Sequence, residues 1–331
     1  MEAVVENVFT KEILQYFLQQ FNLNEENKKL GDFENYVFEV FKDQTPFILR
    51  ITHSSHRSED QLLSELDWVN YLHNQGVNVP KVLTSNNGKL VESAMASDHS
   101  LFFGCLFTKA DGFPVKVRND KHFNPPLFYA WGKTIGKMHH ATKDYKPEGD
   151  VSAREHWDEE ELLNIEKYIP NNEQLIIQNT KELIQKISSL PKNKDIYGLI
   201  HTDVHSGNFF FDGEEIHVFD FDDCCHHWFA SDIAIPLYYS ALWHLPDAEK
   251  NEGNAFSSIF LSSFIKGYET ENKLPPDWKE HLPLFLQLRD VLLYSVFHKK
   301  YAPEDRNERI NQLLEEFRSR IEKKETIVDI I

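Results

Sequence analysis

The apolar residues of this chain follow the two-residue period of strands in one early stretch and the longer period of helices over most of its second half. In "YVFEVFKDQTPFILRIT" (36–52), apolar and polar residues alternate on both sides of the turn signal Lys42-Asp43, which predicts a hairpin of two strands. From residue 123 onward, apolar residues recur every three or four positions, as on amphipathic helices. A chain of 331 residues with this pattern predicts a small α/β part followed by a larger, mainly helical part.

Local signals place further elements in both parts. The stretch 58–76 has helical spacing, with Ser58 as N-cap and Gly76 at its end. Asn87-Gly88 predicts a hairpin turn between strand candidates on either side, and 100–112 reads as a further strand. Helices are predicted at the N-terminus over 9–21 and, in the second part, over 123–140, 172–190, 231–243, 254–269, 280–301 and 305–325.

Composition limits the partners of the chain. With 35 basic and 53 acidic residues the net charge is −18, which repels polyanions, so neither nucleic acid nor an anionic membrane is expected as a partner. The charge hints at an amine-bearing substrate, although it could equally serve only to keep the protein in solution. The N-terminus lacks the features of a signal peptide, and three cysteines give no disulfide framework. We expect a cytoplasmic protein, and the sequence does not predict an oligomeric state.

The segment "HTDVHSGNFFFDGEEIHVFDFDDCCHHW" (201–228) concentrates Asp, His and Cys residues. Its end resembles a zinc site, but Cys224 and Cys225 are adjacent, so their side chains diverge, and no second Cys pair exists in the sequence. We therefore interpret residues 224–227 as a loop.

The carboxylates of the same segment are spaced for other chemistry. Asp203 precedes Asn208 by five residues, and a short hairpin turning at Asp212-Gly213 returns the chain to Asp220. Carboxylate and amide oxygens suit Mg²⁺, which completes its shell with phosphate and water. A further Asp without metal can accept a proton from a hydroxyl nucleophile, and together these are the parts that phosphoryl transfer needs. Alternatively, the three residues could be ordinary turn residues.

The pattern His201-x-Asp203-x₄-Asn208, followed by "VFDFDD" and "SDIAIPL", resembles the aminoglycoside phosphotransferase/choline kinase family of the protein-kinase-like superfamily. The motif also resembles the branch near homoserine kinase and the bacterial stress-response kinases. The resemblance implies Asp203 as catalytic base and Asn208 and Asp220 as metal ligands. It also implies that Asp232 braces the catalytic loop. His201, His205 and Asp222 are supporting candidates, with structural or solvated alternatives left open.

The first part of the chain carries the same resemblance more weakly. Arg50 in "FILRI" and Glu65 in "LLSELDWVNYL" match the cation on a strand and the glutamate on a helix that hold nucleotide phosphates in kinase-like folds. Arg replaces the usual Lys, with different geometry. The phosphate loop "LGDFENYVFEV" contains only Gly31 as glycine. The cofactor-binding residues implied by the resemblance are Arg50, Glu65, Gly31, Asn35 and, in the hinge "LFTKADG", Thr108 and Ala110.

The resemblance therefore implies an α+β, bilobal, protein-kinase-like fold. Residues 1–107 would form the nucleotide-binding lobe with an antiparallel sheet and one main helix, 108–112 the hinge, and 113–331 the helical lobe with the catalytic and metal site. The implied activity is transfer of phosphate from ATP, with Mg²⁺, to a hydroxyl of an unidentified small molecule such as an amino alcohol, amino acid, sugar or aminoglycoside. Two alternatives stay open: a stress-response Ser/Thr protein kinase, and a nucleotide-binding protein without catalysis.

Overall fold

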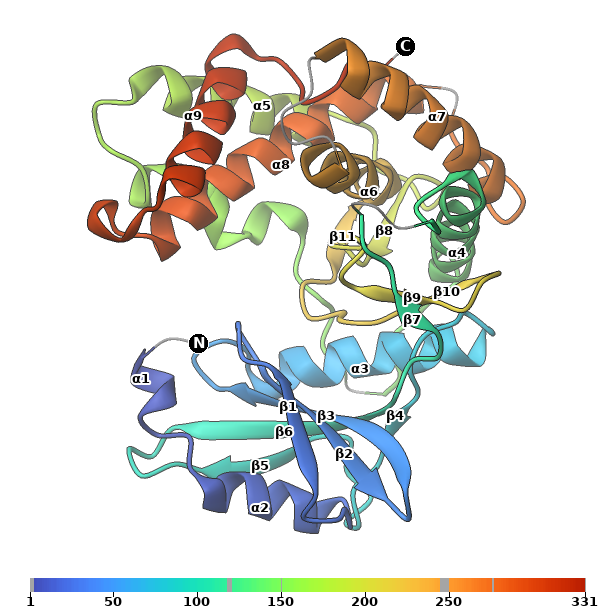
Figure 1. Ribbon diagram of the computed structural model, residues 1–331, viewed down its shortest axis with the longest axis vertical. Helices are drawn as coiled ribbons and strands as arrows, with labels where there is room; N and C mark the ends of the chain where they lie inside the picture. The colour runs from blue at the N-terminus through green and yellow to red at the C-terminus, as the bar shows by residue number, and fades with distance from the viewer. Residues whose placement is uncertain (1–2, 118–120, 150, 245–249, 276, 331) are drawn as a thin grey trace. The chain divides into compact units, whose positions relative to one another are not determined.

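The structure is a computed structural model that describes residues 3–117, 121–149, 151–244, 250–275 and 277–330 (Figure 1). The chain divides into two compact units. The first comprises Met1–Asp111, Tyr145–Arg154 and His217–Asp222, and the second comprises Gly112–Asp144, Glu155–Ile216 and Asp223–Ile331.

The first unit is built on a six-stranded antiparallel sheet. Its strand order is β1-β2-β3-β6-β4, and β5 also pairs with β6. The predicted hairpin is present as β2 and β3. The strands are β1 (Asn27–Gly31), β2 (Tyr36–Lys42), β3 (Thr45–His53), β4 (Val82–Leu83), β5 (Glu92–Met95) and β6 (Leu101–Thr108).

Helices cover this sheet, and the alternation along β3 decides which residue faces which helix. Leu49 and Ile51 are buried in a core that includes Phe17 and Leu18 of α2 (Lys11–Gln20). Because side chains alternate along a strand, the intervening Arg50 points to the other face, where it meets α3 (Glu59–Asn74). Ser58 caps α3 as predicted, within a capping box. A short helix, α1 (Ala3–Glu6), precedes α2.

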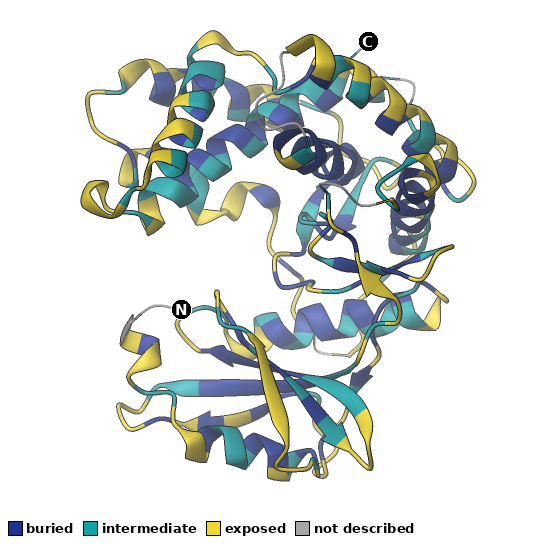
Figure 2. Ribbon diagram, viewed as in Figure 1, coloured by how far each residue is buried: buried dark blue, intermediate teal, exposed yellow. Residues whose placement is uncertain are grey.

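The second unit is mainly helical. Helix α6 is buried along almost its whole length (Figure 2), because its sequence is apolar all round. Two short sheets accompany the helices: β11 pairs with β8, and β7 pairs with β9, which turns into β10. The helices are α4 (Pro125–Thr142), α5 (Gln174–Ser188), α6 (Phe229–His244), α7 (Lys250–Tyr268), α8 (Trp278–Lys300) and α9 (Glu308–Lys323). The strands are β7 (Phe113–Pro114), β8 (Tyr197–Ile200), β9 (Phe209–Phe211), β10 (Ile216–Val218) and β11 (Cys225–Trp228). Short 3₁₀ turns lie at Trp157–Glu159, Glu161–Leu163, Ile165–Lys167 and Pro303–Asp305.

Helices α4 and α7 approach each other closely through glycine. A Cβ atom added to Gly132 would lie 1.9 Å from the carbonyl oxygen of Phe264, and one added to Gly267 would lie 1.9 Å from the carbonyl oxygen of Tyr129. Only residues without side chains permit backbones this close, so these positions fix how the two helices pack.

Two local predictions are wrong. Asn87-Gly88 does form a tight turn, with the N–H of Gly88 donating to Ser85, but the flanking strands β4 and β5 pair with β6 and not with each other. Residues 225–227 were expected in a loop, yet they belong to β11, which pairs antiparallel with β8. Partners distant in sequence decide both cases. The predicted α+β class is confirmed, with an antiparallel sheet and one main helix in the first unit and a helical second unit. In the described ranges, no helix is long and apolar enough to cross a membrane.

Candidate active site

The loop after β8 is held by a carboxylate from the start of α6. Asp232 is fully buried and accepts hydrogen bonds from the backbone N–H groups of His201 and Thr202, at 3.0 and 2.8 Å. Thr202 has a φ of 69°, a left-handed conformation that costs free energy and persists only where the surrounding contacts impose it. Burial alone would raise the pKa of Asp232, but the hydrogen bond from His139 lowers it, so Asp232 stays ionised. The bracing role that the family resemblance implies for Asp232 requires such a contact.

Asp203 lies one residue beyond this brace and is about one-fifth exposed. The Nδ2 of Asn208 donates to the backbone oxygen of Asp203 at 3.0 Å and to its Oδ2 at 3.3 Å. Because these two hydrogen bonds use the amide nitrogen of Asn208, its amide oxygen remains for another partner. An oxygen donor is what a hard cation such as Mg²⁺ requires, so the residue fits its predicted role as a ligand.

A guanidinium from α8 neutralises the carboxylate of Asp203. Arg289 donates from Nη2 to the Oδ1 of Asp203 at 2.5 Å, and from Nε to the hydroxyl of Tyr239 at 3.1 Å. Burial would raise the pKa of Asp203, but the charge of Arg289 and a hydrogen bond from His205 lower it. Asp203 is therefore a carboxylate at neutral pH, as a proton acceptor must be.

His205 and two aromatic residues of α6 stand beside Asp203. The Nε2 of His205 lies 3.3 Å from the Oδ2 of Asp203, and its ring meets those of Tyr239 and Trp243 edge-on, at 5.1 and 5.2 Å between centroids. Burial raises the pKa of Tyr239 to about 12, so its hydroxyl keeps its proton. His201, by contrast, is fully buried, and its Nδ1 accepts from the N–H of Asp203 at 3.3 Å, which is a structural position.

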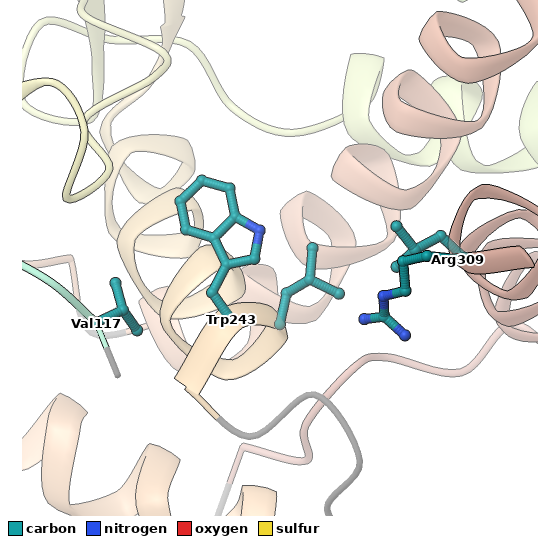
Figure 3. Close-up of a pocket in the computed structure, with 5 residues that line it drawn as sticks. Val117, Trp243 and Arg309 are labelled. Carbon is teal, nitrogen blue, oxygen red and sulfur yellow. The ribbon is translucent and has the colours of Figure 1, made fainter. Parts of the chain in front are cut away.

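A pocket of about 390 Å³ opens next to this aromatic group (Figure 3). Trp243 stands between Val117 and Arg309 in this view, and the lining is mainly apolar. The helical spacing of Tyr238, Tyr239 and Trp243 in the sequence predicts core positions for them. That holds for Tyr238, which is fully buried, but Trp243 is about one-third exposed and links the pocket to His205.

In the first unit, Arg50 and Glu65 form a bidentate ion pair. Nη1 and Nη2 of Arg50 donate to Oε1 and Oε2 of Glu65 at 2.8 and 2.6 Å, and both side chains are buried. Arg50 and Glu65 therefore do not form a surface ion pair. Burial disfavours the charged form of Arg50, but the charge of Glu65 raises its pKa well above the ordinary value.

Asp222 is enclosed by side chains of the first unit. Its carboxylate accepts from the Nε2 of His56 at 2.6 Å, the Nε of Arg57 at 3.3 Å and the Nδ2 of Asn35 at 3.4 Å. Burial would raise the pKa of Asp222, but the bond from His56 and the charges of Arg57 and Arg50 lower it strongly. Glu34, His56 and Asp222 are the one group within the described part of the chain whose donor atoms lie close enough to share a metal ion. The two cations, His56 and Arg57, instead indicate that Asp222 anchors the loop between β3 and α3.

The remaining predicted residues have less distinctive surroundings. Asp220 is exposed, with a φ of 68°. Gly31 has ordinary φ and open space around its Cα, so the backbone there does not require glycine. The N–H of Thr108 already donates to the carbonyl of Lys81 at 3.0 Å, which removes it as a donor to adenine. Ala110 is half-buried.

Sequence reasoning missed the cations that surround the predicted carboxylates. Arg289 was the detectable one, because Arg289-Asp290 interrupts an otherwise apolar helical pattern, and charges in such positions are paired when buried. The fully buried Asp290 has its own partner, Arg320, at 2.7 Å. His56, Arg57 and Arg154 also bind Asp222. The sequence around these three residues gives no indication of that contact.

Comparison with known proteins now decides the family. The sequence profile described as "Phosphotransferase enzyme family" matches residues 28–281. The chain belongs to this phosphotransferase family. The predicted resemblance to the aminoglycoside phosphotransferase/choline kinase group is thereby confirmed, and so is the prediction of a kinase.

Individual family members show how similar the chain is. Amicoumacin kinase of Bacillus subtilis (strain 168) is 40% identical over 293 residues, which cover 88% of this chain and 86% of that protein. A solved structure, amicoumacin kinase hAmiN in complex with AMP-PNP, Ca²⁺ and Ami, is similar with a TM-score of 0.94 and 36% identity over 100% of this chain and 98% of that one. A microcompartment-associated aminopropanol kinase shares the fold, with a TM-score of 0.75 and 20% identity over 95% of each chain. This phosphotransferase is therefore a kinase that acts on a small molecule.

Proposed function

We propose that this phosphotransferase transfers the γ-phosphoryl group of ATP, in the presence of Mg²⁺, to a hydroxyl group of amicoumacin or a close structural analogue. The observation that carries the proposal is the match to amicoumacin kinases at 40% and 36% identity over nearly the whole chain. The braced loop that presents Asp203 supports it, because a kinase needs a fixed carboxylate beside its acceptor.

Asp203 would act as the base. The acceptor hydroxyl donates its hydrogen bond to the carboxylate, and its oxygen forms a bond to the γ-phosphorus while the bond from that phosphorus to the β,γ-bridging oxygen breaks. The hydroxyl proton passes to Asp203, and ADP carries away the electron pair of the broken bond. Positioning by the Asp232 brace and by Asn208 would supply much of the rate, since there is little covalent chemistry for the protein to perform.

Residues of the first unit would bind the nucleotide. Arg50, oriented by Glu65, would neutralise phosphate charge. The N–H of Ala110, which makes no hydrogen bond to the described residues, is a better donor to adenine than that of Thr108. Gly31 and Asn35 would lie in the phosphate loop, as the family resemblance implies. Asn208 and Asp220 would supply oxygen ligands to Mg²⁺, which offsets the negative charge of the phosphates.

The test is direct. Purified full-length protein is incubated with ATP, MgCl₂ and, separately, amicoumacin, an aminoglycoside, choline, homoserine and 1-amino-2-propanol, and products are identified by mass spectrometry. We expect a monophosphate of amicoumacin formed with the highest kcat/KM. If another acceptor is preferred by tenfold or more, or if amicoumacin is returned unchanged, the proposed substrate is wrong.

A further inference from the structure

The guanidinium of Arg289, next to the proposed base Asp203, has N–H groups that make no hydrogen bond to the described residues. Nη2 is bound to Asp203 and to Tyr239, and Nε is bound to Tyr239. Nη1 makes no hydrogen bond to any residue within the described ranges, although Arg289 is mostly buried, with 16% of its side chain exposed. A guanidinium has five N–H donors in a fixed plane, so two donors of Nη1 remain for a ligand.

The position of these donors is fixed from several sides. The guanidinium stacks on the ring of Tyr239, 4.8 Å from its centroid, and Tyr239 is itself packed against Trp243 at 4.5 Å. Arginine held by a stacked ring and a carboxylate loses little further freedom on binding a ligand. The group is therefore organised before the acceptor arrives.

The charge at this place argues against an ammonium group next to the reacting hydroxyl. Arg289 neutralises Asp203, and the charge of Asp223 also acts on this guanidinium. A cation placed next to Nη1 is nevertheless repelled, because the guanidinium itself is the nearest charge. An oxygen atom with lone pairs, by contrast, satisfies the free donors of Nη1. The overall charge of −18 therefore does not describe the charge that the acceptor meets at Asp203.

We propose that Arg289 selects the acceptor. Its guanidinium holds Asp203 and binds, through Nη1, an oxygen atom of the acceptor. This oxygen belongs to the carbon adjacent to the one that carries the phosphorylated hydroxyl. The class of acceptor is an alcohol with a neighbouring carbonyl, carboxamide or carboxylate oxygen. This inference rests on the proposed function for the reaction itself, and it goes beyond that function in naming the group that is recognised. Arg289 is thus a positioning and specificity residue for the acceptor.

The neighbours of Tyr239 on α6 and of Arg289 on α8 provide a matched control. Tyr238 of α6 and Asp290 of α8 form a similar buried group with Arg320 of α9, with distances of 2.6 Å from the Tyr238 hydroxyl to Asp290 and 2.7 Å from Arg320 to Asp290. This group has the same chemistry but lacks Asp203. Replacing Arg320 therefore reports the cost of a disturbed buried ion pair alone.

The experiment compares wild type, Arg289→Lys, Arg289→Met and Arg320→Lys. The assay uses amicoumacin, or the acceptor that the panel above identifies. Arg289→Lys should lose about ten- to a hundredfold in acceptor kcat/KM, which corresponds to the free energy of one hydrogen bond to a charged group. The KM for ATP should stay unchanged, and Arg289→Met should lose more than Arg289→Lys. Arg320→Lys should lower thermal stability and leave acceptor kcat/KM within twofold. Equal effects of Arg289→Lys and Arg320→Lys on kcat/KM would overturn the proposal.

A binding measurement separates this inference from the reaction. The affinities of 2-hydroxypropanamide and 1-amino-2-propanol, which differ in the group next to the hydroxyl, are measured by ligand-observed NMR without ATP. Wild type should bind the amide more tightly by about tenfold, as one added charged hydrogen bond predicts, and Arg289→Met should bind the two alike. Equal binding by wild type contradicts the selection, whether or not any acceptor is phosphorylated. Turnover of no acceptor, with this preference present, contradicts only the proposed function.

Discussion

Arg50 of β3 and Glu65 of α3 form a buried ion pair through two parallel hydrogen bonds of 2.8 and 2.6 Å. Replacing Arg50 by Met leaves the Glu65 carboxylate buried without its partner, which costs about 3–5 kcal/mol in the free energy of unfolding for pairs of this kind. Urea denaturation of wild type and Arg50→Met measures the difference. A loss below about 1 kcal/mol, the range of exposed ion pairs, would show that the pair is not structurally important.

The double variant Arg50→Met/Glu65→Leu separates stability from binding. With both charges removed, most of the lost free energy of unfolding should return, because no unpaired carboxylate remains. Affinity for ATP, measured by calorimetry, should stay as low as in Arg50→Met. Recovery of ATP binding together with stability would remove Arg50 from the nucleotide site.

Asp232→Asn should lower kcat. The carboxylate of Asp232 accepts from the backbone N–H groups of His201 and Thr202, in the loop that presents the proposed base Asp203. A carboxamide can accept from only one, since its NH₂ group would face the other donor. A charged hydrogen bond contributes about 1.5–3 kcal/mol, so kcat should fall by about tenfold or more. Asp290→Asn, in a buried carboxylate that does not contact the loop, should leave kcat within twofold. Equal kcat values for Asp232→Asn and wild type would contradict the bracing role.

Features that depend on residues close together in the sequence could be predicted, whereas features that depend on residues far apart in the sequence could not. The β2–β3 hairpin and helix α3 with its Ser58 cap were predictable because their signals are local. Strand β11 was not, because its partner β8 lies 25 or more residues earlier. The same holds within the site. Asp203, Asn208 and Asp220 share one motif, whereas Arg289 reaches Asp203 from 86 residues away. His56 and Arg57 reach Asp222 from 166 and 165 residues away, and no local pattern encodes such a contact.

Gly132→Ala should destabilise the second unit. The new Cβ would lie 1.9 Å from the carbonyl oxygen of Phe264, and forcing packed backbones apart costs about 1–3 kcal/mol. Gly31→Ala is the matched control, because its Cβ would meet no atom within 4 Å. Thermal denaturation should show a clearly lower Tm for Gly132→Ala only. Equal Tm values for the two variants would mean that α4 and α7 do not pack this closely in solution.

His227 should make stability sensitive to acid. Burial lowers its pKa to about 3, and its Nδ1 accepts from the N–H of Trp228 at 2.8 Å, so the folded state keeps the ring neutral. In the unfolded chain the pKa is near 6.5. Between these values the unfolded state binds more protons, and stability falls as the pH decreases. The expected loss from pH 7 to pH 5 is roughly 2 kcal/mol from this residue.

The check is urea denaturation at pH 7 and pH 5. His227→Asn keeps an acceptor for the N–H of Trp228 and removes the titrating group, so it should show a smaller loss between the two pH values than wild type. His140→Asn, at an exposed position, should behave like wild type. The same acid sensitivity in all three proteins would place its origin elsewhere.

The most direct test of the account is phosphorylation of amicoumacin by wild type and by Asp203→Asn, followed in the same assay with ATP and MgCl₂. The account predicts rapid formation of the phosphorylated product by wild type. It predicts a loss of at least about a thousandfold in kcat for Asp203→Asn, since general base catalysis typically contributes about 10²–10⁴ and the asparagine also loses the ion pair with Arg289. Asp195→Asn, at an exposed position, should match wild type. Comparable turnover by Asp203→Asn and wild type would contradict the assignment of Asp203 as the base.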